Sequence, residues 1–98
     1  MDEGIITFLL CDGQRDWSTN ARRYDFGLFA HGDVSVGAVK HPDGTLELNV
    51  AGVGSEPMAL KQRIPPSNHR GLRVAIAWTR SRATLYLKGR PVQTVDLH

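Results

Sequence analysis

The chain has 98 residues, of which 41% are hydrophobic and 22% are charged, and this describes one globular domain with a single modest core. Twelve Lys and Arg residues against ten Asp and Glu residues give a net charge of +2. This charge is too small to draw the chain to nucleic acid or to a membrane surface by bulk attraction. The one cysteine, Cys11, excludes an internal disulfide and a multi-cysteine zinc site.

The two halves of the chain differ in charge. Residues 1–49 carry a net charge of −4, and residues 50–98 carry a net charge of +6. Solvated charges on the outer faces of strands explain this asymmetry most simply. The alternative is an acidic face and a basic face that meet between copies of the chain.

The first expected strand, residues 4–11, is apolar on both of its faces. Ile6, Phe8 and Leu10 point one way, and Ile5, Leu9 and Cys11 point the other way. A strand in a small antiparallel sandwich normally has one polar face, so the second apolar face needs a cover from the same chain or from another copy. We take this as an indication of self-association. The apolar run is far shorter than the about 20 residues that cross a bilayer, and Asp2 and Glu3 precede it where a signal peptide is positively charged.

Residues 12–24 form a long loop that is rich in polar and aromatic side chains. Loops of this length in compact domains tend to be functional or disordered. An indole ring offers a flat apolar face to a sugar, while Asp, Asn and Arg supply directional hydrogen bonds. The loop therefore predicts a glycan-binding site formed by Asp12, Arg15, Asp16, Trp17, Asn20, Arg22 and Arg23. The competing interpretation is structural: Trp17 caps the edge of the sandwich, and the arginines pair with neighbouring aspartates.

Period-two alternation dominates the rest of the chain and predicts half-buried antiparallel strands. With residues 4–11 and 58–64 included, the pattern predicts an all-β fold of about eight strands. The inward-facing sets are expected to be Tyr24, Phe26 and Leu28; Val34, Val36 and Ala38; Leu46, Leu48 and Val50; and Leu72, Val74, Ile76 and Trp78.

Turn residues separate these strands. Residues 41–44, His-Pro-Asp-Gly, suit a type I turn and predict a hairpin between residues 34–40 and 45–51. Residues 31–33 should reverse the chain before that hairpin. Lys88 and Gly89 predict a further tight hairpin, because glycine supplies the positive φ that such turns require. Residues 65–68, which begin with two prolines, must leave the sheet because proline has no backbone donor.

Two segments resemble one known family. GIITFLL is similar to the first inner strand of concanavalin A-like lectin and glucanase jelly rolls, laminin G-like domains included. Residues 70–97, RGLRVAIAWTRSRATLYLKGRPVQTVDL, resemble the paired late hairpins of that family. The resemblance implies that residues 1–98 form one shortened two-sheet antiparallel sandwich of jelly-roll type, whose relatives bind glycans, proteins or calcium, or hydrolyse polysaccharides. A shortened sandwich leaves sheet edges uncovered, and pairing between protomers is one way to cover them.

Other chemistries that the resemblance raises find little support in the residues. Asp12, Asp16 and Asn20 could offer oxygens to calcium, but three neighbouring arginines oppose a cation, so we expect no metal and no cofactor. The family's glucanases place acidic residues at alternate positions of one strand, whereas Glu47 has Thr45 and Asn49 there. We therefore expect no enzymatic activity. Binding of nucleic acid would require one basic face, which the spacing does not provide for Arg63, Arg70, Arg73, Arg80, Arg82 and Arg90.

The sequence thus predicts a non-catalytic binding module that is lectin-like, binds carbohydrate and self-associates. The alternative function is that of a structural protein that assembles into a homo-oligomer through β-sheet surfaces. The expected partners are a glycan or protein ligand and further copies of the chain, without a membrane or nucleic acid. If the chain is complete, the absence of a signal peptide predicts a cytoplasmic location.

Overall fold

The computed structural model describes residues 3–11, 21–54, 56–64 and 71–97, and this part of the chain is all-β. It contains no helix long and apolar enough to cross a membrane. The prediction of an all-β sandwich with about eight strands is confirmed. The strands are β1 (Gly4–Leu10), β2 (Tyr24–His31), β3 (Val34–Lys40), β4 (Thr45–Ala51), β5 (Met58–Arg63), β6 (Leu72–Trp78), β7 (Arg82–Leu87) and β8 (Arg90–Asp96).

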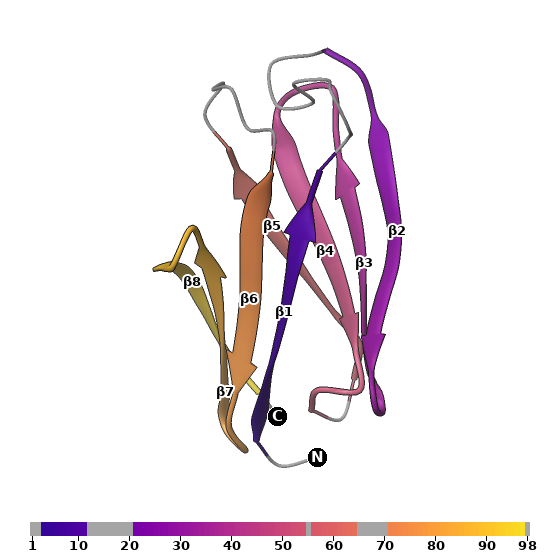
Figure 1. The fold of residues 1–98 in the computed structure, drawn as a ribbon. Coiled ribbons are helices and arrows are strands. Elements are labelled where there is room, and N and C mark those ends of the chain that lie inside the picture. Colours follow the sequence, from indigo (N-terminus) through magenta and orange to yellow (C-terminus); the bar gives the residue numbers. More distant parts are fainter. Residues whose placement is uncertain (1–2, 12–20, 55, 65–70, 98) are drawn as a thin grey trace.

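The strands form two antiparallel sheets of four strands that pack face to face (Figure 1). One sheet, called the β1 sheet, has the order β1-β6-β7-β8, and the other, called the β2 sheet, has the order β2-β3-β4-β5. The edge strands β1 and β2 approach each other along one side of the sandwich, and β5 and β8 approach each other along the opposite side. Each sheet therefore has two edges that no described strand pairs.

The core lies between the sheets and is built by alternation along the strands. β3, β4 and β6 each point every second side chain inward, and all of those inward side chains are buried. The inward sets predicted for these three strands are confirmed. The buried apolar residues are Ile6, Leu10, Val34, Val36, Ala38, Leu46, Leu48, Val50, Val53, Leu60, Ile64, Leu72, Val74, Ile76, Trp78, Ala83 and Leu85.

The predicted inward set of β2 is wrong at its third member because the strand contains a β-bulge. Asp25 pairs with Val39 but Gly27 pairs with Ala38, so that Phe26 is an extra residue on β2. Gly27 has a φ of +87°, and its N–H donates to Asp25 Oδ1 over 2.9 Å. The extra residue inverts the alternation beyond the bulge. Phe29 therefore packs against the core, and Leu28 is 70% exposed.

The predicted hairpins are confirmed at residues 41–44 and 88–89. The N–H of Gly44 donates to the carbonyl oxygen of His41 over 3.0 Å. The N–H of His41 donates to the carbonyl oxygen of Thr45 over 2.8 Å. Lys88 and Gly89 have φ values of +54° and +79°, the signs that a two-residue type I′ turn requires. These turns set the register of the β3–β4 and β7–β8 pairs.

The close approach of Gly52 to the backbone of Asp33, at the end of the sandwich away from residues 41–44, yields a stability prediction. Gly52 has a φ of +90°, and a Cβ there would collide with the backbone of Asp33. We expect Gly52→Ala to lower the free energy of unfolding by about 2–4 kcal/mol, because strain and collision act together. Gly37→Ala is the control, since a Cβ there would lie 3.9 Å from Leu28 Cδ1 in ordinary contact. Urea unfolding measures both, and equal effects of the two substitutions would contradict this role of Gly52.

Candidate functional site

The exposed apolar side chains of the sandwich gather on the side where β1 and β2 approach each other. Ile5 is 57% exposed, Leu9 is 55% exposed and Leu28 is 70% exposed. Val92 on β8 is the only other large hydrophobic side chain that is exposed among the described residues. Ile5 and Leu9 point away from the core, as the alternation of β1 predicts. Leu9 lies against Gly71, and both side chains stay more than half exposed.

A groove of about 480 Å³ runs between the edges of β1 and β2. Its floor is closed by the rings of Phe8 and Phe29, which stack with their centroids 4.4 Å apart and their planes at 12°. Both rings are partly buried and pack against the core. The lining residues are Ile5, Ile6, Thr7, Phe8, Leu28, Phe29, Ala30 and His31. We call this groove, together with Leu9, the open side.

The outer face of the β1 sheet is flat next to the open side. Ala77 lies beside Ile5 and Ala75 lies beside Thr7 in the register of β1 and β6. Both alanines are short and half-buried, so they leave room for a surface to approach β1. The charged side chain nearest in register is Arg73, the partner of Leu9.

The predicted glycan site lies mostly outside the described residues. Arg22 and Arg23 are described and are exposed just before β2. Their backbone is held by Lys40, whose Nζ donates to the carbonyl of Arg22 over 3.0 Å and lies 5.6 Å from the centroid of the Tyr24 ring. The other five predicted residues are outside the described part of the chain: Asp12, Arg15, Asp16, Trp17 and Asn20. The three possible calcium ligands are among these five.

Lys40 is a structural residue that the sequence analysis did not single out. It is the one fully buried charged residue in the described part of the chain, and burial lowers its pKa while the charge of Asp43 acts in the opposite direction. Its position could have been found, because it continues the inward alternation of Val34, Val36 and Ala38 on β3. Its contacts place the start of β2 against the end of β3.

Glu47 contacts His41, Lys61 and Asn49 on the outer face of the β2 sheet. Its carboxylate lies 3.1 Å from His41 Nε2 and 3.9 Å from Lys61 Nζ, and it accepts a hydrogen bond of 3.0 Å from Asn49 Nδ2. The hydrogen bonds with Asn49 and His41 lower the pKa of Glu47 and favour its ionised form. These contacts tie the β3–β4 turn to β5, which is a structural role.

Basic residues lie at both ends of the sandwich. Arg63, Lys88 and Arg90 surround an apolar hollow of about 410 Å³ at the end where β5 finishes and β8 begins. Arg82 begins β7 at the opposite end, and its Nε lies 3.9 Å from Asp96 Oδ1. In the described part of the chain, no group of three His, Cys, Asp or Glu side chains is placed to hold a metal ion.

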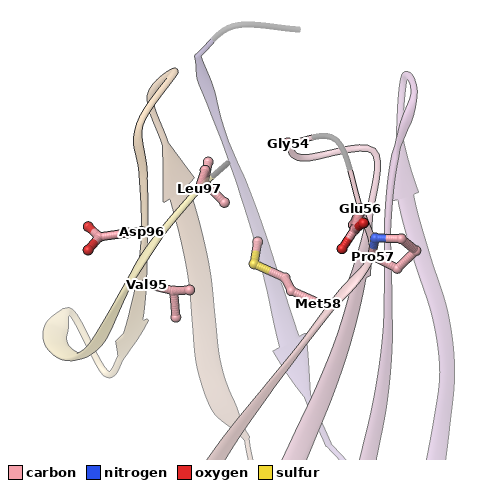
Figure 2. Close-up of a pocket in the computed structure, with 7 residues that line it drawn as sticks. All are labelled: Gly54, Glu56, Pro57, Met58, Val95, Asp96 and Leu97. Atoms are coloured by element: carbon pink, nitrogen blue, oxygen red, sulfur yellow. The ribbon is translucent and has the colours of Figure 1, made fainter.

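A small hollow of about 240 Å³ lies on the side where β5 approaches β8 (Figure 2). Met58 and Val95 extend into the space between these two strands, and Leu97 extends toward Gly54. The two carboxylates at its rim do not converge, because Asp96 points away from the hollow and Glu56 lies beside Pro57 (Figure 2). The hollow therefore offers apolar contact and no paired acidic groups.

Comparison of the chain with protein-family models, curated proteins and solved structures finds no significant match.

The anchoring role of Lys40 is open to direct test. We expect Lys40→Ala to lower the free energy of unfolding by about 1–3 kcal/mol, because it removes the donor to the Arg22 carbonyl and leaves a cavity beside Tyr24. Lys61→Ala is the control, since Lys61 is exposed and reaches Glu47 only at 3.9 Å, and we expect a change below about 0.5 kcal/mol. Chemical denaturation measures both variants. Equal stability of Lys40→Ala and the wild type would contradict the anchoring role.

Proposed function

We propose that this protein is a non-catalytic β-sandwich that works by assembling with further copies of itself through the open side. The observation that carries the proposal is the exposure of Ile5, Leu9 and Leu28 on one side of the molecule. Exposed large apolar side chains that gather in one region of a small protein commonly mark an interaction site. The neighbouring alanines of β6 support this function, because they make the adjoining surface flat.

The size of the apolar contribution indicates how strong such an assembly would be. Full burial of one Ile or Leu side chain contributes about 1.5–3 kcal/mol. Ile5 and Leu9 are a little more than half exposed, so these two side chains from each of two copies would contribute about 3–7 kcal/mol. Association costs about 4–15 kcal/mol in lost freedom of motion. Apolar burial alone therefore does not hold the copies together, and the assembly depends on further contacts and on protein concentration.

Carbohydrate binding by the loop before β2 is the second candidate function. The exposed guanidinium groups of Arg22 and Arg23, beside a carbonyl fixed by Lys40, support it within the described residues. The indole that would stack on a sugar is Trp17, so binding of a glycan that Trp17→Ala abolishes is the observation that this function requires. Such binding is independent of the open side.

The assembly function predicts a concentration-dependent mass. Light scattering coupled to size exclusion, from about 1 μM to about 1 mM, should show a species heavier than the 10.8 kDa chain at the upper concentrations. Leu9→Lys should keep the chain at 10.8 kDa, because it places a charge in the apolar contact. Val92→Lys is the matched control, since it adds the same charge to an exposed apolar position on β8 and should leave assembly intact. A wild-type chain of 10.8 kDa at every concentration would contradict the proposal.

A further inference from the structure

The four edge strands of the sandwich are not equally protected against pairing with another strand. Edge strands usually carry charges, prolines or bulges that prevent such pairing. The pairing of β2 with β3 and the pairing of β8 with β7 each contain a register shift of the kind that a bulge produces, and β8 also contains Pro91. β5 carries Lys61 and Arg63. β1 has no charge and no proline, and it pairs with β6 without interruption from Gly4 to Leu10.

The backbone groups that face the free edge of β1 can be identified from the hydrogen bonds of the sheet. The N–H of Lys88 donates to the carbonyl of Arg73 over 3.0 Å, so Arg73 directs its backbone groups toward β7. Because these directions alternate along a strand, the next residues of β6, Leu72 and Val74, direct theirs toward β1. Their partners are Leu10 and Phe8. Continued alternation along β1 leaves Ile5, Thr7 and Leu9 with backbone donors and acceptors directed at the free edge.

The sequence of β1 is nearly symmetric about Thr7. Ile5 and Leu9 lie two residues on either side of it, and Ile6 and Phe8 lie one residue on either side. In an antiparallel pair of two β1 strands centred on Thr7, Ile5 of each copy therefore faces Leu9 of the other copy. On the inner face, Ile6 of one copy faces Phe8 of the other. From Ile5 to Leu9, each apolar residue therefore faces an apolar residue and Thr7 faces Thr7, while Gly4 faces Leu10 at the two ends of the pair.

We propose that two copies of the chain pair β1 with β1 in antiparallel orientation about a two-fold axis at Thr7, joining the two β1 sheets into one continuous sheet. This inference names the contact that the assembly function leaves open, and it rests on that function. The free-edge groups of Ile5, Thr7 and Leu9 then form three hydrogen-bonded pairs, which exchange about six backbone hydrogen bonds. Since the strand has no charged side chain, the pairing brings no like charges together.

The register distinguishes this arrangement from neighbouring ones. Two β1 strands can form hydrogen bonds only where residues with backbone groups at the free edge lie opposite each other. The registers nearest to the proposed one therefore have their two-fold axis at Ile6 or at Phe8. An axis at Ile6 places Glu3 against Leu9 and Thr7 against Ile5. An axis at Phe8 likewise places Thr7 against Leu9. The axis at Thr7 alone matches the two exposed apolar side chains with each other.

Cysteine cross-linking tests the axis directly. With Cys11 replaced by serine, Thr7→Cys would place two thiols on Cα atoms about 5.5 Å apart, within the range that a disulfide spans. With glutathione disulfide as the oxidant, we expect dimers of Thr7→Cys to form at least about tenfold faster than dimers of Thr94→Cys. The control lies on β8, the opposite edge of the same sheet, and is likewise exposed. Circular dichroism confirms that both variants fold.

A second pair of variants keeps the test independent of Thr7. In an equal mixture of Ile5→Cys and Leu9→Cys chains, the axis at Thr7 predicts disulfides between unlike chains in excess over those between like chains. If the wild type assembles but Thr7→Cys cross-links no faster than Thr94→Cys, the pairing is overturned while the assembly function stands. If the wild type is monomeric at every concentration, both are overturned. A chain that is monomeric alone but binds an extended peptide of another protein along β1 would also overturn the pairing between copies.

Discussion

The unpaired edge of β1 is the constraint on which the proposed assembly depends. Two sheets of four strands have four edges, and each edge presents backbone donors and acceptors that no described strand pairs. Three edge strands carry a bulge, a proline or charged side chains, whereas β1 carries only apolar residues, glycine and threonine. The exposed Ile5 and Leu9 lie on the same strand as this unprotected edge. Hydrogen bonding and apolar burial therefore favour the same partner surface.

Neither contribution is sufficient by itself. The apolar side chains supply about 3–7 kcal/mol against an association cost of about 4–15 kcal/mol, and backbone hydrogen bonds contribute only about 0.5–1.5 kcal/mol each when they replace bonds to water. Together they support a reversible assembly that responds to concentration. This balance suits a sandwich that has a buried core within the single chain, because the chain can then fold before it assembles.

The sequence predicts most of the sheet structure because period-two alternation is uninterrupted in β3, β4 and β6. It fails at β2, where Phe26 is an extra residue and the side chains beyond it exchange faces. The alternation of Asp25-Phe26-Gly27 does not indicate this bulge, because the bulge is defined by how β2 pairs with β3. Lys40 was missed for another reason: its position in the alternation is inward, but a lysine at the end of a strand is normally solvated. The aromatic loop that predicts carbohydrate binding lies mainly outside the described residues, so Trp17 stays a prediction.

Amide hydrogen exchange along β1 tests the central claim most directly. The amides of Ile5, Thr7 and Leu9 face the free edge, whereas those of Ile6 and Phe8 are bonded to β6. In dilute protein the free-edge amides should exchange much faster than their neighbours, and at high concentration they should become protected. The N–H of Leu97 donates to the carbonyl of Ser81, so alternation along β8 directs the amide of Thr94 toward the free edge of that strand. The Thr94 amide should therefore exchange fast at every protein concentration. Exchange of the Ile5, Thr7 and Leu9 amides at rates independent of protein concentration would contradict assembly through β1.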